Sequence, residues 1–205
     1  MAVVSISRQY GAGGVKLGMK LAERLGYQFV DRNLLGQVAE QANVSLKWVE
    51  EVEKEAGGLM ARFVAEWARQ HPHVRNIPDA STRFDETAYR AFLTRVISNL
   101  AAGDRVVFMG RGSQYILKNN PKAVRISLVA SEQTRIANLM EHYSVDRAKA
   151  EHVVNKEEKR RLAFLCGFGE GKSEETACYH AVLNTGLVHQ DDAVDFICKL
   201  VERIG

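Results

Sequence analysis

The opening segment, Val3 to Gly14, constrains the fold most, because it predicts a strand, a glycine-rich loop and the start of a helix. Residues 2–6 are small or β-branched, which is typical of a strand buried on both faces. After Gly14 the apolar residues recur with a helical period, and Gly26 ends the segment. A strand that enters a helix through glycines presents free backbone N–H groups and the positive end of the helix. This arrangement favours a phosphate.

The rest of the chain alternates between strands and helices. Further strands are predicted at 27–30, 105–109, 124–129 and 179–183. Such alternation indicates a parallel sheet with helices on both faces, and ligands bind such sheets at the carboxyl ends of the strands. The glycine loop follows the first strand, and three polar residues follow other strands: Asp31, Arg111 and Asn184. Loops from four strands are therefore expected to converge on one edge of the sheet.

The composition is that of an ordinary soluble protein. The 205 residues are 46% hydrophobic and 26% charged, and the net charge of +3 is too small to indicate a nucleic acid partner. No apolar run approaches the roughly 18 residues that span a membrane. Three cysteines without a Cys-x-x-Cys pair favour a reduced, cytoplasmic setting. The apolar residues between Trp48 and Trp67 would allow a helical interface in a homo-oligomer.

The glycine loop departs from the usual phosphate-loop pattern, Gly-x-x-x-x-Gly-Lys-Ser/Thr. Alignment places Arg8 at the first glycine, Gly13 at the second and Gly14 where the lysine belongs. Either Arg8 or Lys16 is a candidate for the missing positive charge. The alternative is a tight turn in which the glycines only permit unusual backbone angles.

Two further basic features belong to the predicted site. Arg111 lies between glycines after the third strand, where its guanidinium suits a phosphate, although a surface arginine is the alternative. A charged helix starting at Asp146 carries Lys156, Lys159 and Arg160 on one face, with Arg161 adjacent. This helix is interpreted as an arginine-bearing lid or, alternatively, as a solvated surface. No set of residues is predicted to hold a metal ion.

These motifs resemble the cytidylate kinase-like family, a branch of the P-loop nucleoside monophosphate kinases. The resemblance rests on Ser7–Gly14, Phe29–Asp31, Met109–Arg111, Lys159–Arg161 and Leu183–Thr185. It implies an α/β fold of three layers, with a five-stranded parallel sheet flanked by helices. It also implies a single domain over residues 1–205, with a helical nucleotide-binding insertion at about 31–100 and a lid at about 144–172.

The resemblance further implies transfer of the ATP γ-phosphate to CMP or dCMP, with Mg²⁺. It assigns the donor phosphates to Gly11, Ala12, Gly13 and Gly14. It assigns the acceptor to Asp31, Arg111 and Arg135. The lid cations would be Lys156, Lys159, Arg160 and Arg161, and the donor base would lie near Asn184 and Thr185. Ordinary cytidylate kinases have lysine at position 14, a hydroxyl residue at 16 and aspartate at 112, where this chain has Gly14, Lys16 and Gly112.

Two other functions remain open from the sequence. The missing lysine favours a regulatory protein of the same fold that binds nucleotides without efficient transfer. The segment from Val44 to Asp85 has no pattern that can be assigned to CMP binding, which leaves open a kinase for another small phosphate acceptor.

Overall fold

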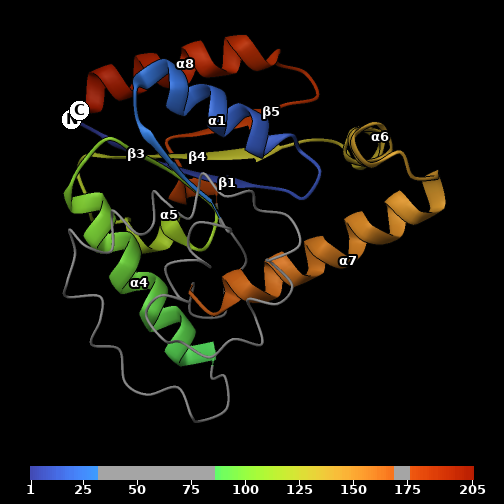
Figure 1. Cartoon of the computed structure of the whole chain (residues 1–205), viewed down its shortest axis with the longest axis horizontal. Coiled ribbons are helices and arrows are strands. Elements are labelled where there is room, and N and C mark those ends of the chain that lie inside the picture. The colour runs from blue at the N-terminus through green and yellow to red at the C-terminus, as the bar shows by residue number, and fades with distance from the viewer. Residues whose placement is uncertain (32–85, 169–175) are drawn as a thin grey trace, which may run out of the picture. The chain divides into compact units, whose positions relative to one another are not determined.

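The computed structural model describes residues 1–31, 86–168 and 176–205 (Figure 1). These residues belong to two compact units. One unit comprises Met1–Phe29 with Leu100–Gly205, and the other is Val30–Asn99. Most of the predicted insertion, including its helices between 32 and 85, lies outside the described residues. The helix predicted to open at Asp85 is α4, Glu86–Ala102, in which Leu93, Val96 and Ile97 are buried.

The sheet has five strands in the order β2-β3-β1-β4-β5. Strand β1 lies between β3 and β4 and pairs with both in parallel, and β5 pairs with β4 in parallel. This order confirms the predicted fold class. The strands are β1 Val3–Arg8, β2 Gln28–Val30, β3 Val106–Met109, β4 Ala123–Val129 and β5 Ala181–Asn184.

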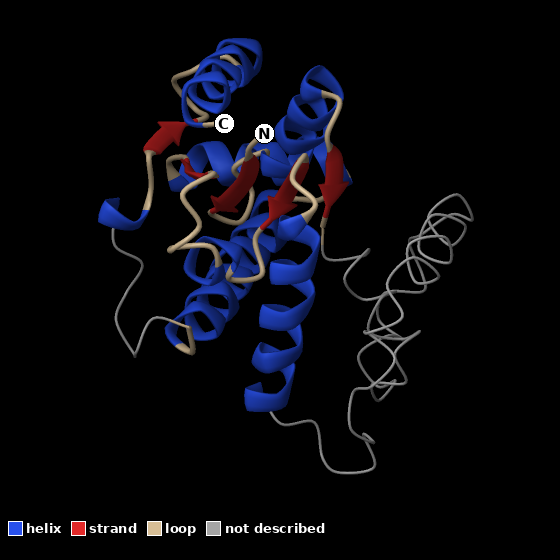
Figure 2. Cartoon of the chain, turned by 90° about the vertical axis from the view of Figure 1, so that its left-hand side faces the viewer, coloured by secondary structure: helices blue, strands red, loops and turns tan. Residues whose placement is uncertain are grey.

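Helices cover both faces of the sheet, so that α1 and α8 lie together on one face and the short helix α5 lies on the other (Figures 1 and 2). The main core forms between the sheet and these two long helices. Its members are buried aliphatic residues at alternate strand positions and at helical spacing, for example Ile6, Leu17, Ile126 and Ile197. The helices of this unit are α1 Gly14–Leu25, α5 Ser113–Ile116, α6 Glu132–Tyr143, α7 Arg147–Cys166 and α8 Gln190–Ile204.

A second, smaller core joins α6 to α7 beside the carboxyl ends of the strands. Ile136 and Leu139 of α6 are buried together with Ala150 and Val154 of α7. Both helices begin where the sequence predicts, because the side chains of Ser131 and Asp146 accept hydrogen bonds from backbone N–H groups of the first turn. The packing therefore fixes which face of α7 turns toward the strand ends.

Two predicted strand boundaries are wrong by two residues, and the other boundaries differ by at most one. The first strand does not stop at residue 6, because Ser7 and Arg8 continue the ladder opposite Ser127 and Leu128 of β4. Arg8 is therefore the last residue of β1 and not a residue of the loop. The last strand begins at Ala181 and not at residue 179, because a 3-10 turn occupies Thr176–Cys178.

Among the described residues, no helix has the length and apolar character needed to cross a membrane.

Candidate active site at the carboxyl ends of the strands

The glycine loop takes the shape predicted for a phosphate cradle. Gly11 and Gly13 have φ angles of 86° and 70°, which are left-handed values that side-chain-bearing residues adopt at a cost. Gly13 is the N-cap of α1 and, having no side chain, makes no capping hydrogen bond to the first turn of this helix. The N–H groups of that turn have no acceptor within the helix, so this end of α1 favours an anion.

Neighbouring elements hold this loop in place. The Thr185 hydroxyl, just beyond β5, donates to the Ala12 carbonyl at 3.0 Å, and the Asn138 amide of α6 donates to the Gly11 carbonyl at 2.8 Å. A Cβ atom at Gly11 would lie 2.8 Å from the Arg135 carbonyl oxygen, so only glycine fits this close approach. The loop is therefore positioned by β5 and α6 before any ligand binds.

Arg8 extends from the end of β1 alongside two glycines. A Cβ atom at Gly14 would lie 2.9 Å from Cγ and 3.1 Å from Cβ of Arg8, so the aliphatic part of the side chain fills that space. A Cβ atom at Gly110 would overlap Nη1 of Arg8, so the guanidinium lies against the turn after β3. The positive charge of Arg8 thus lies between the ends of β1 and β3, beside the start of α1.

Glu158 of α7 joins two arginines to the loop. Its carboxylate accepts the Tyr10 N–H at 2.9 Å and Nη2 of Arg161 at 2.8 Å, and Nη1 of Arg135 lies 3.9 Å away. Arg161 also donates to the Ser7 hydroxyl at 3.5 Å. The side chains of Glu158, Arg161 and Arg135 are only 15%, 17% and 11% exposed, so solvent screens their charges weakly.

The turn after β3 is a run of left-handed residues. Gly110, Arg111 and Gly112 have φ angles of 73°, 58° and 72°. Arg111 is the one among them with a side chain, and this backbone conformation costs a residue with a Cβ about 1–2 kcal/mol. Its guanidinium carbon lies 5.8 Å from the centre of the Phe164 ring of α7, which is a cation–π distance. A Cβ at Gly112 would lie 2.9 Å from the Phe168 ring.

The structure brings together only part of the predicted site. Arg8 and Arg135 lie beside the loop of Gly11, Ala12, Gly13 and Gly14, Arg161 contacts Ser7 near the end of β1, and Thr185 contacts the loop. Arg111 follows β3 and lies over the Phe164 ring of α7. By contrast, Lys156, Lys159 and Arg160 lie on the exposed side of α7. The charged face predicted to be the lid therefore includes one residue at the loop, Arg161, and three that are solvated.

Lys16, Asn184 and Asp31 are the remaining predicted residues. Lys16 is exposed in the first turn of α1, and Asn184 accepts the Gly186 N–H through its side-chain oxygen at 3.0 Å. Asp31 directly follows β2 and belongs to the other compact unit, Val30–Asn99.

The sequence indicates that Glu157 and Glu158 pair with basic residues of this helix, but it does not show that Glu158 also binds the loop at Tyr10. It gives no role to Asn138, which holds the Gly11 carbonyl, or to the aromatic residues Phe164 and Phe168. The spacing of Glu158 and Arg161 signals a helical ion pair, but Glu157 and Arg160 carry the same signal one position earlier. Only the packing of α7 on α6 distinguishes the buried pair from the exposed one.

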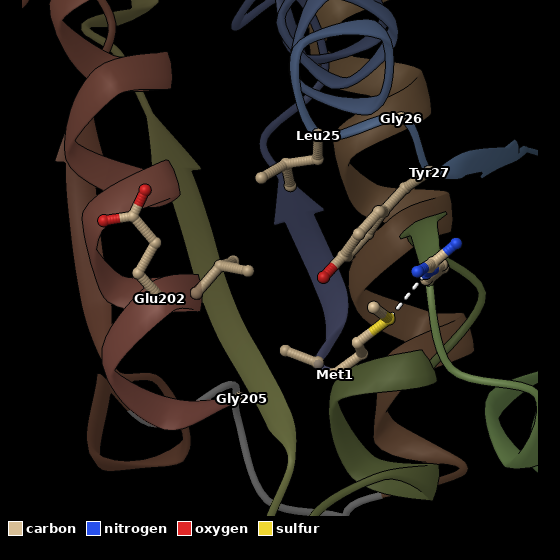
Figure 3. Close-up of a pocket in the computed structure, with 9 residues that line it drawn as sticks. Met1, Leu25, Gly26, Tyr27, Glu202 and Gly205 are labelled. Carbon is tan, nitrogen blue, oxygen red and sulfur yellow. Dashed lines mark hydrogen bonds between the residues drawn. The ribbon is translucent and has the colours of Figure 1, made fainter.

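A cavity of about 470 Å³ lies at the opposite end of the strands (Figure 3). The close-up shows Met1, Tyr27, Glu202 and Gly205 around it, with a hydrogen bond between Arg105 and the Met1 sulfur. The cavity contains none of the predicted site residues. Because ligands of parallel α/β sheets bind at the carboxyl ends of the strands, the loop and its arginines are the better candidate for the active site.

The residues around the loop fit a phosphate better than a magnesium ion. Uncapped N–H groups and arginines suit phosphate oxygens, whereas Mg²⁺ is held by oxygen ligands, usually one or two protein oxygens together with water and phosphate oxygens. With Gly14 at the lysine position, Val15 stands where the pattern has its hydroxyl, one residue before Lys16, to which the family resemblance assigns that position. The Glu158 carboxylate is occupied by Arg161 and the Tyr10 N–H. Within residues 1–31, 86–168 and 176–205, no three His, Cys, Asp or Glu side chains are grouped so that they could hold a metal.

The strand order and the glycine-rich loop are those of the P-loop kinase fold. The chain belongs to the cytidylate kinase-like family, whose sequence pattern matches residues 3–187. No curated protein matches the chain in sequence with significance.

Solved structures with this fold cover nearly the whole chain. An uncharacterized protein from Eubacterium ventriosum has a TM-score of 0.65 and 20% identity, over 98% of this chain and 99% of that one. Shikimate kinase from Acinetobacter baumannii, in complex with shikimate, has a TM-score of 0.52 and 16% identity, over 99% and 94%. A gluconokinase from Sinorhizobium meliloti has a TM-score of 0.51 and 11% identity, over 98% and 94%. At these identities the likeness concerns the fold.

Proposed function

We propose that this protein is a nucleoside monophosphate kinase that transfers the γ-phosphate of ATP to CMP or dCMP. The observation that carries the proposal is that Arg8, Arg135 and Arg161 gather around the end of β1 and the start of the glycine loop: Arg8 lies beside Gly14, Arg135 donates to the Tyr10 carbonyl, and Arg161 donates to the Ser7 hydroxyl. These cations come from β1, α6 and α7, and no single stretch of sequence places them together. Membership of the cytidylate kinase-like family supports this reaction and this class of acceptor.

In the proposed reaction an oxygen of the acceptor phosphate attacks the γ-phosphorus of ATP, and the bond to the β-phosphate oxygen breaks to release ADP. No covalent enzyme intermediate is required, so catalysis consists of positioning and charge stabilisation. The N–H groups at the start of α1 hold the donor phosphates. Arg8 supplies positive charge at the transferring group, and Arg111 orients the acceptor phosphate.

Glu158 positions two further cations for the same reaction. Its carboxylate accepts two hydrogen bonds from Arg161, one from Nε at 3.1 Å and one from Nη2 at 2.8 Å, and Nη1 of Arg135 lies 3.9 Å away. An arginine whose rotamer is already fixed loses less conformational entropy when a phosphate binds. Arg135 and Arg161 are thus ready to stabilise charge on the phosphates, while Lys156, Lys159 and Arg160 contribute only a diffuse positive potential.

A second candidate is a nucleotide-binding regulatory protein that does not transfer phosphate efficiently. Gly14 favours it, because the lysine that usually reaches the β- and γ-phosphates is absent. A third candidate is a kinase for another small phosphate acceptor. The solved structures of a shikimate kinase and a gluconokinase share this fold, and for this reason we consider acceptors other than nucleotides as well.

An assay of ADP release with ATP and Mg²⁺ separates these functions. The acceptors are the nucleoside monophosphates and their deoxy forms, followed by shikimate and gluconate. Turnover that depends on CMP or dCMP supports the proposal. Binding of ATP without turnover on any acceptor indicates the regulatory protein, and turnover confined to another acceptor indicates the third candidate. An Arg161→Ala variant serves as the control for a contaminating kinase, because its turnover with the same acceptor must fall.

A further inference from the structure

The position of Gly14 is unusual in this loop, because its backbone does not require glycine. Gly14 is the first residue of α1 and has a helical conformation, unlike Gly11 and Gly13 with their positive φ angles. Glycine in a helix is less favourable than alanine, which the chain could otherwise use here. Something other than backbone geometry must therefore favour a residue without a side chain.

Arg8 supplies the reason. A Cβ at Gly14 would lie 2.9, 3.1 and 3.4 Å from Cγ, Cβ and Cδ of Arg8, which is closer than real Cβ atoms usually approach other carbons. These are the atoms near the backbone of Arg8, and Arg8 is fixed in the β1 ladder opposite Leu128. A side chain at position 14 and an arginine at position 8 therefore compete for one space. The guanidinium then continues to Gly110, where a second Cβ would overlap Nη1.

We propose that Arg8, Gly14 and Gly110 form one interdependent unit in which Arg8 replaces the phosphate-loop lysine and both glycines make room for it. The missing lysine is then a steric consequence of Arg8 and not a loss of function. Restoring the usual residue by Gly14→Lys should weaken ATP binding, because the new side chain displaces Arg8. This inference rests on the proposed function, since it assigns Arg8 to the phosphates of the donor nucleotide.

A double-mutant cycle on Arg8→Ala and Gly14→Ala tests the proposal. Gly14 is the better glycine to change, because Gly110 has a φ of 73° and any substitution there adds backbone strain. The probe is β,γ-methylene-ATP, with affinity measured by calorimetry. Each single variant should bind about tenfold to a hundredfold more weakly, as expected for a lost hydrogen bond to a charged group. The double variant should bind no more weakly than Arg8→Ala alone.

Thermal unfolding of the four proteins without nucleotide gives a second readout. In the Arg8→Ala background, Gly14→Ala should raise Tm by about 2–4 °C, because the helix gains alanine and no clash remains. In the wild-type background this gain should be lost. Arg24→Ala is the matched control. Arg24 lies in the last turn of α1 and pairs with Asp195 of α8, and the Arg24 side chain is 61% exposed. Its affinity for the probe should equal that of the wild type.

Two results would overturn the inference while leaving the proposed function intact. One is wild-type affinity in Arg8→Ala or Gly14→Ala, and the other is tighter binding by Gly14→Lys. If the wild-type protein itself does not bind β,γ-methylene-ATP, the proposed function fails and the assignment of Arg8 fails with it.

Discussion

Replacing Glu158 with glutamine tests whether its carboxylate organises the arginines at the loop. Glutamine has nearly the same shape and can still accept the Tyr10 N–H, so the change mainly removes the charge facing Arg161 and Arg135. Exposed ion pairs contribute about 0–1 kcal/mol, and breaking buried ones costs about 3–5 kcal/mol. With the side chains of Glu158 and Arg161 15% and 17% exposed, we expect an intermediate loss of about 2 kcal/mol in unfolding free energy.

The neighbouring residue provides a matched control. Glu157 pairs with Arg160 at 3.0 Å with the same i,i+3 spacing, but the side chain of Arg160 is 67% exposed. Glu157→Gln should therefore cost less than about 0.5 kcal/mol. For a chain of this size, about 2 kcal/mol corresponds to roughly 4–8 °C in Tm, measured by calorimetry. If the two variants melt within a degree of each other, Glu158 does not organise the site as described.

Three other predictions concern the residues that hold the strand ends. Thr185→Val should lower the unfolding free energy by about 1–2 kcal/mol in urea titrations, because the hydroxyl bond to the Ala12 carbonyl is lost; an unchanged midpoint would contradict this role. Arg111→Gly should be more stable than Arg111→Ala by about 1 kcal/mol in the same assay, since only glycine adopts a φ of 58° without strain; equal stabilities would show that the turn is not strained. Partial desolvation and the nearby Arg125 charge lower the pKa of His180, whose Nδ1 accepts the backbone N–H of Arg125 at 3.0 Å. The neutral form is thus favoured on folding, so this contribution to stability is complete above pH 6.5 and is lost as the pH falls below it. His180→Gln should flatten the decline of Tm between about pH 6.5 and 5, and an unchanged slope would contradict the assignment.

Much of the fold follows from local features of the sequence. The period of the apolar residues, together with the caps at Ser131 and Asp146, predicts where α6 and α7 begin. Gly26 ends α1 in the left-handed conformation expected of a C-terminal glycine. These signals are local because each depends on backbone hydrogen bonds within a few residues. The alternation of strands and helices then restricts the sheet to a parallel arrangement.

The arrangement of the site depends on contacts between distant residues, which sequence patterns do not contain. Arg8 and Gly110 are separated by about a hundred positions, and their contact exists only because β1 and β3 are neighbours in the sheet. For the same reason, the sequence left the choice between Arg8 and Lys16 open. Spacing alone likewise could not show that Ala150 and Val154 are buried against α6, and so could not predict which cations of α7 are exposed.

The most direct test of the central claim follows the γ-phosphate itself. Phosphorus NMR of the protein with ATP, Mg²⁺ and either CMP or dCMP should show the signals of ADP and of the acceptor diphosphate growing together. The same signals should grow much more slowly with Arg8→Ala. The account is contradicted if ATP binds but its γ-phosphate stays in place, or appears only as inorganic phosphate, with every acceptor tested.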